Sequence, residues 1–170
     1  MNTVATLTVG RSGIRWLWIS LVVIVVDQLS KVWIERTMVL GDSFVVLPIL
    51  DIVRAHNTGA AFSFLADAGG WQRWAFSLLA VGVSIALVFW MRRLALATQG
   101  LLAFGLALIL GGAIGNVIDR IEHGYVVDFV HAHWGLHSFP AFNVADSAIT
   151  IGAVLVILDS LLEGRRRRTP

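Results

Sequence analysis

The sequence contains no cysteine among its 170 residues, which excludes disulfide bonds, thiolate nucleophiles and cysteine-ligated metals. It is also poor in charge: Asp, Glu, Lys and Arg make up 14% of the chain, where a soluble domain has about a quarter. Hydrophobic residues account for 57%, and the mean hydropathy is +0.79. One soluble core cannot bury so much apolar surface, whereas lipid can accept it.

Four apolar stretches are long enough to cross a membrane as helices, because a hydrocarbon layer about 30 Å thick needs roughly 20 residues. They cover about residues 16–34, 74–90, 101–118 and 142–162. The first lacks a small-residue cleavage site and is too long for a signal-peptide core, so we expect it to remain as a signal anchor. The sequence therefore predicts an integral membrane protein, mainly α-helical, with residues 1–170 forming a single membrane domain.

Basic residues near the ends of the spans gather on one side: Arg11, Arg15, Arg92, Arg93 and the run at 165–168. By the positive-inside rule this side is cytoplasmic, so both termini are expected inside. The other side holds two longer segments, about residues 35–73 and 122–141, and most of the unusual polar residues lie near that face.

Small residues four positions apart suggest close helix packing, because they let backbones approach when lipid supplies no hydrophobic drive. The pairs are Gly111 with Gly115 (preceded by Ala107), Gly82 with Ala86, and Ala148 with Gly152.

The first outer segment is predicted to form two short strands, 44–48 and 50–54, around a proline turn, followed by a tight loop at 57–61. A small sheet lying on the outer membrane surface would suit it. Four tryptophans are placed as interfacial anchors: Trp33, Trp71, Trp74 and Trp134.

Ionisable residues inside spans are costly and suggest function. Asp27 precedes Lys31 by one helical turn, the favourable order for an ion pair; the pair either anchors the helix at the interface or contributes to a site. At the end of the third span, Asp119 is expected to pair with Arg120. Asn116 lies deeper, and a buried amide needs partners.

Two further carboxylates follow. Asp128 interrupts an apolar, β-branched run, which should raise its pKa; the alternative is a solvent-facing aspartate on a short strand. Asn143 is a plausible N-cap of the fourth span, with Asp146 three residues on in a capping-box arrangement.

A short outer loop joins Asp128 to Asp146, so the two carboxylates can meet. Two adjacent carboxylates share a proton, because both cannot ionise cheaply. One then acts as general base on a water, while the other polarises a carbonyl and later protonates the leaving amine. This is aspartyl-peptidase chemistry, which needs no metal, cofactor or thiol.

Five blocks, in order and separated by the spans, resemble the bacterial lipoprotein signal peptidases (signal peptidase II). They cover residues 27–31, 57–62, 111–120, 126–129 and 142–147. The resemblance implies an aspartyl endopeptidase of the bacterial inner membrane, with its active site near the periplasmic face. Its substrate would be a prolipoprotein, cut before a diacylglyceryl-modified cysteine among the membrane lipids, and globomycin would be an inhibitor.

The resemblance also implies roles for residues. Asp128 and Asp146 would be the catalytic pair. The residues that line or brace the site would be Asn57, Gly59, Asn116, Arg120, Asn143, Asp119, Asp27 and Lys31. A periplasmic β-sheet cradle would form at about residues 44–57, and a short surface helix at about 65–71. No metal site and no nucleic-acid partner is expected.

Two other classes remain as alternatives. A metal-dependent membrane protease could draw on the five histidines, with His131 and His133 beside Asp128, but no HExxH pattern is present. The histidines are His56, His123, His131, His133 and His137. A small transporter or proton-relay subunit could use Asp27 and Asp119, although the acids crowd at one face and no internal repeat is visible.

Overall fold

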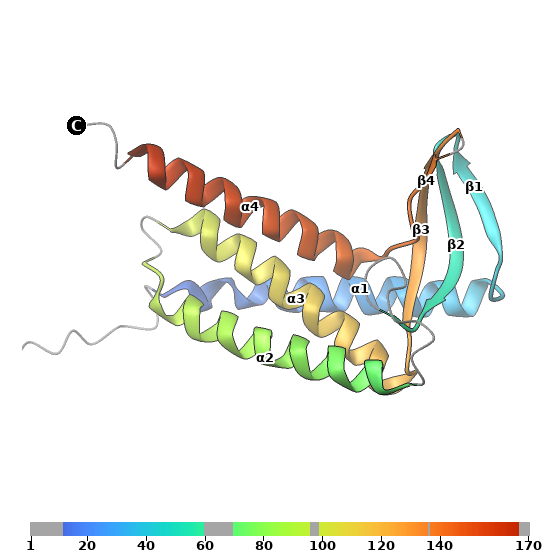
Figure 1. Ribbon diagram of the computed structural model, residues 1–170, viewed down its shortest axis with the longest axis horizontal. Helices are drawn as coiled ribbons and strands as arrows, with labels where there is room; N and C mark the ends of the chain where they lie inside the picture. Colours follow the sequence, from blue (N-terminus) through green and yellow to red (C-terminus); the bar gives the residue numbers. More distant parts are fainter. Residues whose placement is uncertain (1–11, 60–69, 96–98, 136, 167–170) are drawn as a thin grey trace, which may run out of the picture.

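The structure, a computed structural model, describes residues 12–59, 70–95, 99–135 and 137–166. Four long helices run roughly side by side, and a small sheet stands across one end of them (Figure 1). The elements in chain order are η2 (Gly13–Trp16), α1 (Leu17–Thr37), β1 (Ser43–Leu47), β2 (Leu50–Asn57), α2 (Trp71–Arg93), α3 (Gly100–Glu122), β3 (Val126–Trp134), β4 (His137–Ser138) and α4 (Val144–Arg166).

All four predicted spans are present, and every helix is long and apolar enough to cross a membrane. Each helix extends a few residues beyond the predicted span at one or both ends, although α4 starts two residues later than predicted. Arg92 and Arg93 form the last turn of α2. Basic side chains suit a helix C-terminus because they face its negative dipole end. The start of α1 and the end of α4 both lie at the end opposite the sheet (Figure 1).

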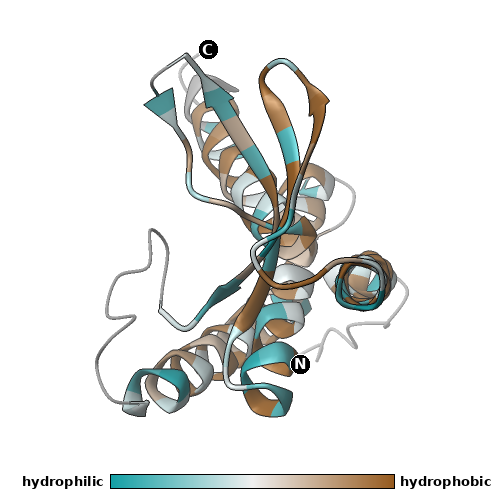
Figure 2. Ribbon diagram, turned by 90° about the vertical axis from the view of Figure 1, so that its right-hand side faces the viewer, coloured by the Kyte–Doolittle hydropathy of each residue, from teal (hydrophilic) through white to brown (hydrophobic). Residues whose placement is uncertain are grey.

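α3 is the central helix. In the most apolar window of α3, 67% of residues are buried, against 22% in α1 and α2 and 17% in α4. The exposed surfaces of the outer three helices are apolar, as with Leu29, Leu78 and Leu161. Figure 2 looks onto the sheet end and shows hydrophobic residues running along the helices. Such a surface suits lipid, and the chain is a multi-pass membrane protein.

Small residues do allow close helix contact, as predicted, on two of the three stretches. A side chain on Gly111 would reach within 2.8 Å of the backbone of Ser20 on α1. On Gly152 it would lie 2.5 Å from the carbonyl oxygen of Gly105 on α3. The prediction for Gly82 is wrong, because a side chain there would meet nothing within 4 Å among the described residues. Small-residue spacing alone does not say whether a helix face meets protein or lipid.

The sheet has four antiparallel strands in the order β1-β2-β3-β4. The predicted strands of the first outer segment are confirmed, with β2 extended to Asn57. The second outer segment supplies β3 and β4, so the sheet is larger than the 44–57 cradle expected. Of the surface helix expected at 65–71, residue 70 lies in a turn and 71 begins α2; the rest lies outside the described residues.

Main-chain pairing joins β3 to the segment that enters α4. Val130 and Phe142 exchange two hydrogen bonds, at 2.8 and 2.9 Å, and the N–H of Phe129 also donates to Phe142 at 3.0 Å. β2 pairs with β3 on its other edge. This pairing holds the start of α4 against β3, and so brings together the two stretches that carry Asp128 and Asp146.

Candidate active site

A cavity of about 900 Å³ lies between the sheet, α3 and the start of α4. Its polar wall holds both carboxylates of the predicted pair, Asp128 and Asp146. The polar residues lining it are His56, Asn57, Asn116, Arg120, Asp128, Asp146, Ser147 and Thr150, and the apolar ones include Ala55, Val126, Phe139, Phe142, Ile149 and Ile151.

Asp128 stands near the start of β3 and is only 3% exposed, so the alternative of a solvent-facing aspartate is wrong. Its carboxylate accepts hydrogen bonds from the amide groups of Asn57, at 3.1 Å, and Asn143, at 2.7 Å. Burial raises the pKa of Asp128 to about 7, and the nearby charge of Asp146 adds to the rise despite these two donors. Near neutral pH, Asp128 therefore holds a proton part of the time.

A β-bulge in β2 sets which side chain faces Asp128. Ile52 pairs with Val130, but Ala55, not Arg54, pairs with Asp128, so β2 carries one extra residue between these points. The bulge therefore places a methyl group opposite the carboxylate, and Arg54 lies near Glu35 instead, with a 3.5 Å ion pair. An arginine opposite Asp128 would favour its ionised form and oppose the raised pKa.

Asp146 belongs to the first turn of α4. Its N–H donates to the side-chain oxygen of Asn143 at 2.9 Å, and the N–H of Asn143 donates to the Asp146 carboxylate at 3.3 Å. This is the predicted capping box, now confirmed. The other carboxylate oxygen of Asp146 accepts from the amide of Asn116 at 2.8 Å. Asp146 thus takes part in the N-terminal capping box of α4 and also lines the cavity.

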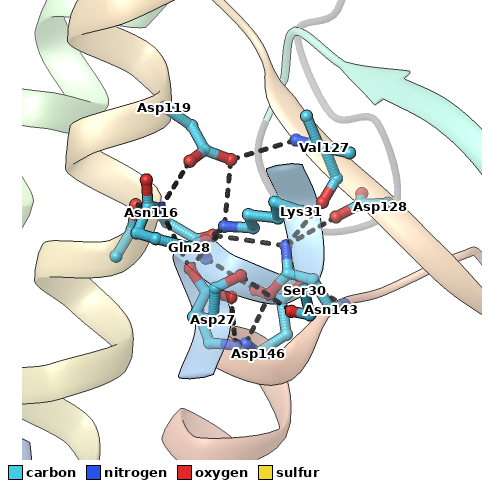
Figure 3. Close-up of polar contacts among 12 residues, drawn as sticks. Asp27, Gln28, Ser30, Lys31, Asn116, Asp119, Val127, Asp128, Asn143 and Asp146 are labelled. Atoms are coloured by element: carbon cyan, nitrogen blue, oxygen red, sulfur yellow. Dashed lines mark hydrogen bonds and ion pairs between the residues drawn. The ribbon is translucent and has the colours of Figure 1, made fainter. Parts of the chain in front are cut away.

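A buried charge cluster lies behind the pair (Figure 3). Lys31 forms ion pairs with Asp27 at 2.8 Å and with Asp119 at 2.9 Å, and all three residues are at most 2% exposed. The predicted pair of Asp27 and Lys31 is confirmed. Lys31 also donates to the side-chain oxygen of Asn116 at 3.0 Å. Because Asn116 in turn donates to Asp146, the cluster braces the Asp146 carboxylate through one amide.

The same cluster holds the start of α4. Asp27 accepts the N–H of Ala145 at 2.9 Å, a favourable place for an anion at a helix N-terminus. The close approach requires Gly115, because a side chain there would lie 2.6 Å from the Asp27 carboxylate. Gln28 donates to Asp119 at 2.8 Å and to the carbonyl of Gly115 at 3.2 Å. The sequence prediction did not single out Gln28, although it lies inside the 27–31 block.

The predicted pairing of Asp119 with Arg120 is wrong. Successive residues on a helix point about 100° apart, so the two side chains diverge. Asp119 faces Lys31, whereas Arg120 donates to the carbonyl oxygens of Gly59 at 3.0 Å and Asn116 at 3.3 Å.

The loop after β2 orients the amide of Asn57. The N–H of Gly59 donates to the side-chain oxygen of Asn57 at 3.0 Å, which leaves the amide nitrogen directed at Asp128. Arg120 holds this turn from α3 through its bond to Gly59. The predicted tight loop is therefore seen at 57–59, and its residues 60 and 61 lie outside the described part of the chain.

His131 and His133 do not join Asp128. His131 and His133 lie on the opposite face of β3, where side chains alternate, and both approach Asp51, at 3.6 and 3.3 Å. Within the described residues, no group of three or more His, Asp or Glu side chains is arranged to hold a metal ion. Burial lowers the pKa of His56, whose ring stacks on Tyr125 at 3.7 Å between centroids.

Sequence reasoning missed the apolar side of the cavity and its extension along α4. Phe139 and Phe142 follow β4, and Ser147, Thr150 and Ile151 follow Asp146. Ser147 lies in the 142–147 block, but nothing marked Thr150, since a hydroxyl in a span is ordinary. Helical spacing from Asp146 was the available signal, because residues three and four positions on share its face.

Comparison with known proteins agrees with this architecture. Residues 19–162 match a family model described as signal peptidase (SPase) II. The chain is 50% identical over 154 residues to a lipoprotein signal peptidase of Shewanella halifaxensis, covering 91% of this chain and 90% of that one. It is 51% identical over 157 residues to that of Shewanella loihica, covering 91% of each.

Two solved structures are similar as well. A bacterial membrane enzyme determined by the in meso method at 2.3 Å resolution superposes with a TM-score of 0.80 at 33% identity, covering 92% of this chain and 93% of that one. A second, at 1.9 Å resolution, gives a TM-score of 0.71 at 31% identity, covering 86% and 92%.

Proposed function

The chain belongs to the signal peptidase II family, and on this premise we propose that Asp128 and Asp146 are the catalytic pair of an aspartic endopeptidase. The observation that carries the proposal is their placement. Both carboxylates line one cavity, and Asn143 hydrogen-bonds to both of them. Burial and the neighbouring charge keep Asp128 partly protonated near neutral pH.

The two carboxylates have different surroundings, which supports different roles. Asp146 accepts two donors, the main-chain N–H of Asn143 and the amide of Asn116, at the positive end of a helix. Asp128 is buried on a strand, and its pKa is raised to about 7 by burial and by Asp146. We assign the resting proton to Asp128 and the negative charge to Asp146, as one titrating pair.

In the proposed reaction, Asp146 removes a proton from a water whose oxygen attacks the scissile carbonyl. Asp128 gives its proton to the carbonyl oxygen, which yields a neutral tetrahedral diol. Asp146 then passes its proton to the leaving nitrogen as the C–N bond breaks. Asp128 recovers a proton from the diol as the carboxylic acid forms. The pair returns to its starting state, and one water has been added across the peptide bond.

The substrate we propose is a prolipoprotein cut before a cysteine that carries a diacylglyceryl group. The curated relatives are named lipoprotein signal peptidases, and the cavity between the sheet, α3 and the start of α4 has a mainly apolar lining. A helix-anchored precursor could reach it without leaving the bilayer, with its lipid still in the membrane. The polar wall offers groups that could hold an unwound peptide where water is scarce.

We further propose that the protein lies in the bacterial inner membrane, with both termini cytoplasmic and the sheet and cavity at the outer face. Arg92 and Arg93, in the last turn of α2, lie at the helix end opposite the sheet, which supports this orientation. A peptide inhibitor such as globomycin would occupy the cavity beside Asp128 and Asp146.

The test is a gel-shift assay with a diacylglyceryl-modified precursor and three purified variants. We expect Asp128→Asn and Asp146→Asn each to lower the cleavage rate by about 10²- to 10⁴-fold, the contribution typical of a general acid or base. Asp159→Asn is the matched control, because Asp159 lies on α4 outside the cavity lining, and it should cleave normally.

A folded Asp128→Asn or Asp146→Asn protein that cleaves as fast as the wild type would contradict the dyad. Folding is checked by the melting temperature in detergent. A strong chelator in the same assay separates the metal-protease alternative, which predicts loss of cleavage where the dyad predicts none.

A further inference from the structure

The cavity continues beyond the proposed pair, along α4. Thr150 lines it and follows Asp146 by four residues and Ser147 by three. Residues so spaced share one face of a helix. Four residues of helix rise about 6 Å, so Thr150 lies about that much deeper in the span than Asp146.

The hydroxyl of Thr150 is not used in a hydrogen bond within its own helix. Ser147 and Ser160, on the same helix, each donate to the carbonyl oxygen four residues earlier, both at 3.0 Å. Thr150 makes no such bond and has no hydrogen-bond partner within the described part of the chain. A hydroxyl in a helix usually bonds back to its own backbone, and an open donor in an apolar span is costly unless something else binds it.

The side-chain amide groups that surround the cavity already donate within the protein, and beyond them the Nε of Arg120, on α3, has no partner among the described residues. Asn57 and Asn143 donate to Asp128, and Asn116 donates to Asp146. Ser147 is used within its own helix. Thr150 therefore offers an uncommitted donor to whatever enters the cavity on the membrane side of the pair.

A signal helix needs such a donor, given the proposed function on which this step rests. The peptide must unwind at the scissile bond, so the last four carbonyl groups of its helix lose their internal partners. At this depth water cannot replace them. We propose that Thr150 binds the substrate by donating its hydroxyl to one of these unpaired backbone carbonyls.

Three variants test this with the diacylglyceryl-modified precursor. Thr150→Val keeps the shape of the side chain and removes its hydroxyl. It should lower kcat/KM by about 3- to 10-fold, which is the effect of losing one neutral hydrogen bond. Thr150→Ser keeps the hydroxyl and should stay within about twofold. Ser160→Ala is the matched control and should be unchanged, because Ser160 lies outside the cavity lining.

Thermal stability separates binding from structure. Thr150→Val should melt no lower than the wild type, because the hydroxyl has no partner to lose in the free protein. A lower melting temperature, an unchanged kcat/KM, or an equal loss in Thr150→Ser would each overturn the assignment. If Asp128→Asn abolishes cleavage while Thr150→Val has no effect, only the Thr150 assignment fails; if Asp128→Asn cleaves normally, the proposed function fails.

The ester groups of the diacylglyceryl moiety also carry carbonyl oxygens, so a second substrate distinguishes the two sources. A precursor with an ether-linked dialkylglyceryl group has no ester carbonyl. We expect the loss in Thr150→Val to be the same with this precursor. A loss confined to the ester-linked precursor would overturn the peptide assignment.

Discussion

Lys31 offers a direct measurement of how strongly the buried charge cluster stabilises the protein. Its ammonium group makes two ion pairs, at 2.8 and 2.9 Å, and one hydrogen bond to Asn116 at 3.0 Å. In Lys31→Met, the carboxylates of Asp27 and Asp119 would remain buried without their cation. Breaking a buried pair from one side costs about 3–5 kcal/mol. We expect a loss of that size in the free energy of unfolding, measured by denaturant titration in detergent.

Arg36 supplies the matched control, because it is a cation on the exposed face of the same helix. Arg36→Met should change the free energy of unfolding by no more than about 0.5 kcal/mol. Adding Asp119→Asn to Lys31→Met should recover part of the loss, because it removes one stranded charge, and a double-mutant cycle gives the coupling. If the free energy of unfolding of Lys31→Met lies within about 1 kcal/mol of the wild-type value, the reasoning is refuted, because an exposed ion pair contributes that much.

Two further predictions concern the pair's titration and helix packing. The cleavage rate should fall as pH rises through about 7, because Asp128 must hold its proton. In Asn57→Ala this fall should occur at higher pH, because the lost hydrogen-bond donor stabilised the ionised carboxylate of Asp128. A fall that moves to lower pH would contradict the assignment. Gly112→Ala should destabilise by about 1–3 kcal/mol in the same unfolding titration, because its Cβ would collide with the backbone of α4, whereas Gly82→Ala, with nothing within 4 Å, should not.

Much of this fold follows from local sequence. The four spans were predictable because length and apolarity alone decide whether a helix can cross a membrane. The pair of Asp27 and Lys31 and the capping box of Asn143 and Asp146 were predictable too, since each lies within one helical turn. These features depend on spacing along the chain, which the sequence states directly.

The remaining contacts depend on which faces meet, and spacing does not encode that. Lys31 pairs with Asp119 across two helices, and Gly82 faces away from its neighbours although it has the same spacing as Gly111. The bulge that puts Ala55 opposite Asp128 has no sequence signature here, since neither glycine nor proline marks it. The family resemblance nevertheless singled out Asn57 and Arg120, which the structure places on the cavity wall.

Asn143 shows why the capping interpretation and the catalytic interpretation of Asp146 are not alternatives. Asn143 is fully buried, its side-chain oxygen accepts the N–H of Asp146, and its amide group donates to Asp128 at 2.7 Å. The side chain that fixes the first turn of α4 therefore also contacts the second carboxylate. Because the cap and the pair share this residue, a change in the position of the helix start would also change the geometry of the pair. Helix stability and the spacing of the carboxylates are thus set by the same hydrogen bonds.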